Sequence, residues 1–242
     1  MDQGNAEYGC VGGEALIVFD KVFVPNEHVF MCGEWEFAFE LVERFATFHR
    51  QNYGGCKGGL ADVLVGAVYA LTQAQGTSKA SHIRDKIAEM IHLTETIWSC
   101  SIACSCQGFA QPAGSFQADP LLANVTKLNV TRNVYEIARL AHDITGGLLA
   151  TMPSEFDLHD PSVGKYVSKY MAGTADIPVE TRIRLIRLIE AMTCGTSLAE
   201  SMHGAGSPQA QKIMIERRGN LERKKRLAEK LAKIGEQPFL VC

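Results

Sequence analysis

The sequence lacks any run of about 18 uncharged apolar residues, so a membrane-spanning helix is not expected. It also lacks a basic excess, because 24 Lys and Arg residues stand against 27 Asp and Glu residues, a formal net charge of −3. The basic residues are dispersed up to the last thirty positions, so the electrostatic footprint of nucleic-acid binding is missing. The first ten residues, MDQGNAEYGC, have neither the basic start nor the apolar core of a signal peptide. These absences together predict a cytoplasmic protein that binds neither nucleic acid nor membrane.

What the sequence does contain is a large apolar fraction and an unusual number of cysteines. The 242 residues could form one large domain or one and a half, and their hydrophobic content of 46% is enough for an ample core. Eight cysteines in a chain without export signals are expected to be reduced thiols or metal ligands, not a disulfide framework.

The pattern of apolar residues predicts a mainly α-helical chain that follows a short β-segment. Residues 14–24 are rich in Val and Phe, and Pro25 follows them, as in a strand that ends there. Because one strand cannot form a sheet, residues 1–32 are interpreted as the tail of a truncated β-domain and residues 33–242 as a helical bundle. The expected helices are 35–53, 59–75, 79–108, 119–147, 162–171, 179–203 and 208–234.

Two of these helices show their buried faces clearly. In the segment 79–108, helical spacing places on one face Ile83, Ile87, Met90, Ile91, Thr94, Ile97 and Trp98. In the segment 179–203, Ile183, Ile186, Ile189 and Met192 do the same. The last helix carries charges of both signs at helical spacing, which is typical of a solvated face.

The stretch His49–Gly59, with the sequence HRQNYGGCKGG, is the first candidate site. Its four glycines cost helix stability, about 1 kcal/mol each relative to Ala, so some other feature should offset that cost. One interpretation is that His49 and Cys56 bind one metal centre, with Tyr53 and Lys57 beside it. The other is a glycine-broken helix junction with a buried cysteine and a hydrogen-bonded histidine. Two ligands alone do not define a metal site, so both interpretations remain open from the residues alone.

Three other places are candidates for chemistry. Cys100, Cys104 and Cys106 lie in a strongly periodic helix, where core packing competes with metal binding as an explanation. The segment 142–149, HDITGGLL, resembles a helix C-cap, although its glycines would also let backbone amides reach a phosphate. The segment 200–211 is a polar helix–loop–helix junction, in which Ser207 and Pro208 are suited to begin the second helix.

Four motifs together resemble the 4-hydroxybutyryl-CoA dehydratase family, whose members are also vinylacetyl-CoA Δ-isomerases. They are HRQNYGGCKGG at 49–59, FDKVFVP at 19–25, HDITGG at 142–147 and ESMHGAGSPQ at 200–209. The resemblance spans nearly the whole chain but only the C-terminal half of the family's usual length. It implies an acyl-CoA-dehydrogenase-like fold, of which this chain is the end of the middle β-domain and the C-terminal bundle. It also implies homotetramers, or a partner that supplies the N-terminal half.

The resemblance implies two cofactors, FAD and a [4Fe–4S] cluster held by three cysteines and one histidine. His49 and Cys56 match two of the four cluster ligands; the other two belong to a C-x3-C pair in the N-terminal half. Tyr53, Lys57, Glu14 and Glu200 match active-site residues, and His49 doubles as a candidate base. The residues expected to contact FAD are Gly146, Gly147, Gly206, Ser207, Gln209 and Gln211. Because His49 and Cys56 would lie about 10.5 Å apart along an unbroken helix, we expect the helix to break at Gly54-Gly55.

The implied reaction is the reversible dehydration of 4-hydroxybutyryl-CoA to crotonyl-CoA by a flavin and iron–sulfur radical mechanism, with a CoA thioester as substrate. Two alternatives remain open. One is a flavin-dependent aromatic hydroxylase of the 4-hydroxyphenylacetate 3-monooxygenase type, which shares the fold but has no use for a His and Cys ligand pair. The other is an inactive fragment that binds no cofactor alone.

Overall fold

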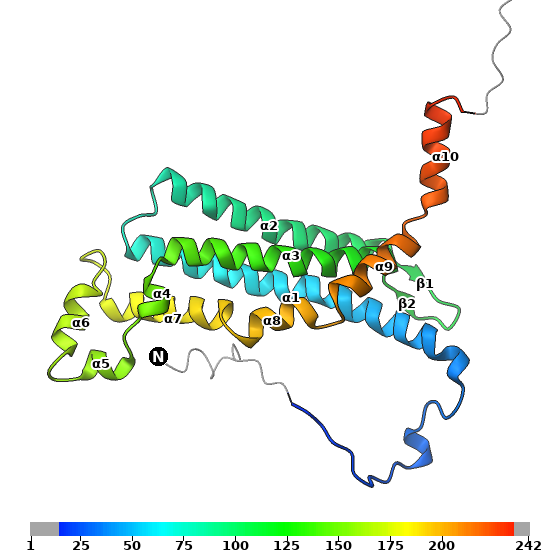
Figure 1. The fold of residues 1–242 in the computed structure, drawn as a ribbon, viewed down its shortest axis with the longest axis horizontal. Coiled ribbons are helices and arrows are strands. Elements are labelled where there is room, and N and C mark those ends of the chain that lie inside the picture. Colours follow the sequence, from blue (N-terminus) through cyan, green and yellow to red (C-terminus); the bar gives the residue numbers. More distant parts are fainter. Residues whose placement is uncertain (1–14, 235–242) are drawn as a thin grey trace, which may run out of the picture.

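A computed structural model of the protein describes residues 15–234, and these residues are mostly helical (Figure 1). The elements in chain order are η2 (Asn26–His28), η3 (Trp35–Phe37), α1 (Ala38–Ala74), α2 (Ser81–Cys106), β1 (Phe109–Ala110), β2 (Phe116–Gln117), α3 (Pro120–Thr145), α4 (Leu148–Thr151), α5 (Glu155–His159), α6 (Gly164–Tyr170), α7 (Val179–Thr193), α8 (Thr196–His203), α9 (Pro208–Arg218) and α10 (Leu221–Leu231). The prediction of a mainly α-helical chain is confirmed.

Three long helices form the centre of the bundle. α1, α2 and α3 lie side by side and pack against one another, while α7 packs against α1 and α9 against α3 (Figure 1). Their apolar stripes meet in a large core cluster, whose fully buried side chains include Val68, Leu71, Met90, Ile186 and Ile189, and two smaller clusters lie apart from it. The helices are therefore held together mainly by burial of apolar surface, the dominant favourable term in folding.

The predicted faces of two helices agree with the observed burial, with one exception. Ile83, Met90, Thr94 and Ile97 of α2 are buried, and so is the isoleucine series of α7. Ile91 is instead 46% exposed, because it lies beside the buried stripe at the next position after Met90. The expected single helix over 179–203 divides at Gly195, and that over 208–234 divides at Asn220; both residues have positive φ.

The predicted break at Gly54-Gly55 is wrong, because α1 continues unbroken from Ala38 to Ala74. The glycines have a packing role instead. A Cβ atom added at Gly54 would lie 2.5 Å from the Cβ of Ser101, and one at Gly58 would lie 2.9 Å from the ring of Trp98. These two glycines therefore let α2 approach α1 closely, and the resulting contacts offset the low helix propensity of glycine.

The predicted strand at 14–24 is not observed over its described part, residues 15–24. A strand needs a hydrogen-bonded neighbour, and within residues 15–234 the only strand pair is the antiparallel β1–β2. The apolar side chains here remain in solvent, with Leu16 93% and Phe23 86% exposed. Figure 1 shows this segment running outside the bundle. The division into residues 1–32 and 33–242 stays a prediction.

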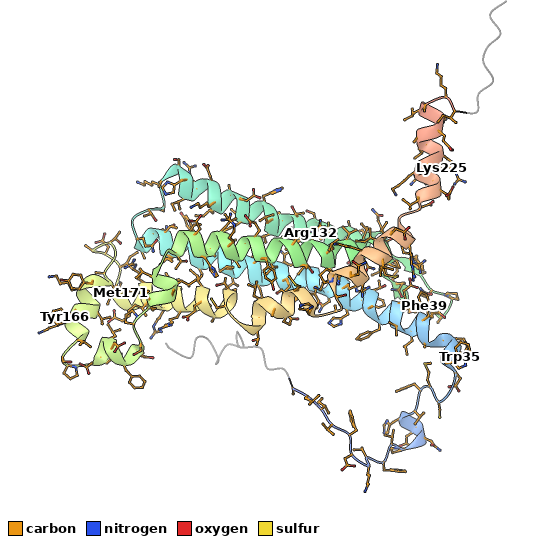
Figure 2. All side chains as sticks on the ribbon, in the orientation of Figure 1. Trp35, Phe39, Arg132, Tyr166, Met171 and Lys225 are labelled. Atoms are coloured by element: carbon orange, nitrogen blue, oxygen red, sulfur yellow. The ribbon has the colours of Figure 1, made fainter. Side chains whose placement is uncertain are left out.

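The two ends of the described chain differ in character. Trp35 and Phe39, labelled in Figure 2, are exposed apolar side chains where the chain enters α1. At the other end α10, which carries Lys225, projects away from the bundle and has no buried residue, as its mixed charges predicted (Figure 2). Within residues 15–234, every helix is too short or too polar to cross a membrane.

Candidate active site

A hydrogen-bonded cluster joins the middle of α1 to the end of α8. Tyr53 and Lys57 lie one turn apart on α1, and both donate to the carboxylate of Glu200 on α8, to its Oε1 and Oε2 atoms respectively. The contact is possible because residue 204 is glycine; a Cβ atom there would overlap the hydroxyl of Tyr53. The structure thus brings together three of the residues expected at the active site.

The cluster keeps Glu200 ionised. Burial raises the pKa of Glu200, but the hydrogen bonds from Lys57 and Tyr53 more than offset burial, and the net pKa lies below the usual value. The side chain of Lys57 is 8% exposed, whereas that of Glu200 is 31% exposed. The carboxylate is therefore the part of the cluster that solvent or a ligand can reach.

Lys127 on α3 lies behind this cluster and was not expected from the sequence. Its side chain is completely buried, and its ammonium group donates to the carbonyl oxygens of Ser201 (2.8 Å) and Met202 (3.1 Å) and to Oγ1 of Thr131 (3.2 Å). The same nitrogen lies 4.7 Å from the ring centroid of Tyr53. Burial lowers the pKa of Lys127 to about 8.

Arg50 is a second buried cation beside the site. Its Nε donates to the carbonyl oxygen of Ala205 (2.9 Å) and its Nη1 to Oδ1 of Asn124 (2.8 Å). Burial lowers the pKa of Arg50. Because Ala205 has a positive φ of 58°, the guanidinium holds a strained turn in place. Arg50 therefore fixes the loop that follows α8, whereas Lys127 fixes the last turn of α8 itself.

His49 and Cys56 lie beside Tyr53 and Lys57, on an adjoining and more open face of the same turns of α1. Seven residues of unbroken helix place them on one face, about 10.5 Å apart along the axis. His49 is half-buried between the rings of Phe45 and Tyr53, at centroid distances of 5.6 and 5.4 Å, whereas Cys56 is exposed. The two side chains therefore share a face that solvent reaches.

The surroundings of this pair leave room for a metal cluster. A Cβ atom added at Gly55 or Gly59, on either side of Cys56, would have no other atom within 4 Å, so the space beside Cys56 is open. Imidazole and thiolate are both donors that iron–sulfur centres accept. No group of three or more His, Cys, Asp or Glu side chains suited to one metal ion exists within residues 15–234. The described part of the chain can thus offer two ligands and open space, and further ligands would have to come from elsewhere.

The residues expected at FAD fall into two separate groups. Gly206 has a φ of 97°, Ser207 caps α9 from its hydroxyl, and Gln209 is exposed. Gln211 is fully buried and donates to the carbonyl oxygen of Gly206, so its observed role is to hold this loop. Ser207 and Pro208 begin α9, as predicted.

Gly146 and Gly147 lie at the far end of α3, 19 residues or about 28 Å from Lys127 along the helix. Gly146 ends α3 with a φ of 75°, as the predicted C-cap requires, and neither glycine has an atom within 4 Å of its Cβ position. The structure therefore does not bring these glycines to the Gly206 loop within one chain. Of the remaining expected residues, Glu14 lies outside the described residues.

The cysteines of α2 have structural surroundings. Cys104 is fully buried, its thiol contacts the carbonyl oxygen of Asp119 at 3.4 Å, and burial raises its pKa to about 11. Cys100 accepts a hydrogen bond from the amide of Asn129, and Cys106 is exposed. A thiol with so high a pKa is a poor metal ligand, because metals bind the thiolate.

Comparison with known proteins identifies the family. Residues 38–233 match the family model described as the 4-hydroxyphenylacetate 3-hydroxylase C-terminal domain. The chain belongs to this family. Its members share a mainly helical, acyl-CoA-dehydrogenase-like fold, as the sequence resemblance implied.

Within the 4-hydroxyphenylacetate 3-hydroxylase C-terminal family, the chain is much more similar to dehydratases than to hydroxylases. It is 50% identical over 97% of its length to the 4-hydroxybutyryl-CoA dehydratase/vinylacetyl-CoA Δ-isomerase of Clostridium aminobutyricum, and covers 50% of that protein. The structure of an oxygen-tolerant archaeal 4-hydroxybutyryl-CoA dehydratase from N. maritimus superposes with a TM-score of 0.88 at 51% identity, covering 91% of this chain and 45% of that one.

The hydroxylase branch of the family is more distant. The oxygenase component of 4-hydroxyphenylacetate 3-monooxygenase, solved with FAD and 4-hydroxyphenylacetate, superposes with a TM-score of 0.75 at 21% identity over 90% of this chain and 48% of that one. At this identity the similarity shows the fold alone. The chain spans about half the length, or less, of the curated relatives it matches.

Proposed function

We propose that this chain is the C-terminal part of a 4-hydroxybutyryl-CoA dehydratase, which converts 4-hydroxybutyryl-CoA reversibly to crotonyl-CoA and also acts as a vinylacetyl-CoA Δ-isomerase. The observation that carries the proposal is the 50% identity to such an enzyme across nearly the entire chain. The open face of α1 adds support, since His49 and Cys56 are donors that a hydroxylase has no use for.

In this proposal His49 and Cys56 supply two of the four ligands of a [4Fe–4S] cluster, and the Gly206 loop contacts FAD. When bound, these groups supply one-electron oxidation of the substrate and a Lewis-acidic iron for its hydroxyl group. The remaining two cluster ligands come from the N-terminal half of the protein. Gly146 and Gly147, too distant from the Gly206 loop in one chain, would contact a flavin of another subunit of a homotetramer. A cytoplasmic location, in which thiols stay reduced, completes the proposal.

The residues of α1 and α8 bind and orient the substrate and handle its protons. The Glu200 carboxylate is held ionised at one fixed position by Tyr53 and Lys57, so it can accept a hydrogen bond from the substrate hydroxyl or a proton from carbon. The imidazole of His49, held against the Tyr53 ring, is the second candidate base, for the proton on C2. Glu14 would add a second carboxylate.

Iron content of the anaerobically purified complete protein tests the ligand assignment. Cys56→Ala should lower the iron bound per chain and remove the broad visible absorption of the cluster, because one thiolate ligand is lost. Cys100→Ala and Cys104→Ala are matched controls within the same bundle, and both should leave iron content unchanged.

Two results would contradict the assignment. Iron retained in full by Cys56→Ala would exclude Cys56 as a ligand. Iron lost from Cys100→Ala or Cys104→Ala, with the fold intact by circular dichroism, would show that the cysteines of α2 bind the metal instead. A protein with flavin but no iron would favour the hydroxylase alternative.

A further inference from the structure

Lys127 is the largest of the fully buried side chains in the described part of the molecule. Burying an ammonium group is costly unless its donors are satisfied. Here all three protons have an acceptor at 2.8 to 3.2 Å, and the Tyr53 ring covers the charge. An arrangement this complete calls for a role, because an apolar residue would fill the same space on α3 at lower cost.

The acceptors of Lys127 point to that role. Ser201 and Met202 directly follow Glu200 in the last turn of α8, where the helix itself leaves backbone carbonyl groups without donors. A cation at the C-terminal end of a helix is also favoured by the helix dipole. Lys127 therefore binds the backbone immediately next to Glu200. Its charge lies over the ring of Tyr53, whose hydroxyl donates a hydrogen bond to Glu200.

We propose that Lys127 is a positioning residue for the cluster of Tyr53, Lys57 and Glu200. It anchors the last turn of α8 to α3 and so determines where the Glu200 carboxylate meets the two donors of α1. Lys127 contacts no part of the cluster's open side, so it acts through Glu200 and not on the substrate. The catalytic consequence rests on the proposed function; the anchoring of α8 does not.

Lys127→Met tests the proposal, because methionine fills the space but leaves the carbonyl groups of Ser201 and Met202 without their donor. In the complete protein this variant should lower kcat about 10- to 100-fold, the size expected when a catalytic group is displaced by about 1 Å. The matched control is Thr126→Val at the neighbouring buried position, whose hydroxyl has no hydrogen-bond partner in the structure. It should leave kcat unchanged.

A double-mutant cycle with Glu200→Gln separates positioning from simple packing. If Lys127 acts through Glu200, the double variant should be no slower than Glu200→Gln alone. Losses that multiply would overturn the proposal, as would an unchanged kcat in Lys127→Met beside a lowered kcat in Glu200→Gln. If Lys127→Met does not fold, Lys127→Arg replaces it in the cycle, because the planar guanidinium of arginine cannot donate to the same carbonyl groups in the same geometry. Its kcat and that of the double variant are then judged by the same criteria.

The same cycle on the thermal unfolding midpoint needs no substrate, flavin or iron. The drop in midpoint for the double variant should be smaller than the sum of the two single drops, because freeing the end of α8 already weakens the Glu200 contacts. Additive drops would overturn the proposal. If Glu200→Gln left turnover unchanged while the thermal cycle stayed non-additive, the catalytic role proposed for Glu200 would fail and the positioning role of Lys127 would stand.

Discussion

Glu200 connects two helices through its two carboxylate oxygens, one for each donor of α1. Because it is also the part of the cluster most open to solvent, it is the best placed of the three to meet a ligand. A residue with that position should matter more for turnover than for stability, because a partly exposed ion pair contributes little to folding.

Replacing Glu200 with Gln removes the charge but keeps the size of the side chain. We expect kcat to fall by roughly 10²- to 10⁴-fold, the usual contribution of a positioned acid or base. The unfolding midpoint should fall by only about 2 to 4 °C, the shift that about 1 kcal/mol causes in a chain of this size. Steady-state kinetics and circular dichroism together check this; a variant within threefold of wild-type turnover would exclude Glu200 from the chemistry.

The buried ammonium of Lys127 makes a specific prediction about pH. Its pKa is about 8 in the folded protein and 10.5 in the unfolded chain, so between these values the unfolded state binds more protons. Stability from this group therefore rises with pH in that window. Between pH 8 and 9.5, the free energy of unfolding of wild type relative to Lys127→Met should rise by about 1 to 2 kcal/mol. Urea unfolding at both pH values measures it, and a constant difference would contradict the buried, desolvated lysine.

At the scale of elements, α1 has two faces with opposite demands on its glycines. Gly54 and Gly58 face α2 at distances that exclude a side chain, while Gly55 and Gly59 face open space. In each Gly-Gly pair the first glycine therefore packs against α2 and the second faces open space, although the two pairs look identical in the sequence.

Alanine substitutions at the four positions should divide accordingly. Gly54→Ala and Gly58→Ala should destabilise the chain by about 1 to 3 kcal/mol through overpacking. Gly55→Ala and Gly59→Ala should stabilise it by up to about 1 kcal/mol through helix propensity. Denaturant unfolding compares the four. Equal effects at all positions would show that α1 is not packed on α2 as described.

The elements also show what the sequence could and could not predict. Helical periodicity identified the bundle, and Ser207 with Pro208 marked the start of α9, since both are local signals. The glycines of α1 were misinterpreted as a break, because the side chains that pack against them, Ser101 and Trp98, are forty or more positions away in the sequence. The strand at 14–24 failed for a related reason, since a strand exists only through its neighbours.

Lys127 was missed although its position carried a signal. It lies in register with Ala123, Val130 and Ile137 on the buried face of α3, and a lysine on an apolar stripe marks a buried charge. Its partners, the carbonyl groups of α8, cannot be read from residue types. Tyr53, Lys57 and Glu200, in contrast, were predicted because the motifs of the family include them.

At the scale of the whole molecule, the chain exposes a large amount of apolar surface. Leu16, Phe19, Phe23, Phe30 and Trp35 are each more than 70% exposed. Surfaces of this kind mark contacts with other protein. They agree with a chain that spans half of its dehydratase relative and that, in the proposal, works with an N-terminal half and further subunits.

The conversion of 4-hydroxybutyryl-CoA by the complete, anaerobically purified protein tests the proposed function most directly. Formation of crotonyl-CoA, followed by chromatography, should require intact His49 and Cys56 and should fall by at least 100-fold when either is replaced by Ala. 4-Hydroxyphenylacetate with reduced flavin and oxygen is the control substrate and should give no hydroxylated product. Hydroxylation of that substrate without any formation of crotonyl-CoA would contradict the account.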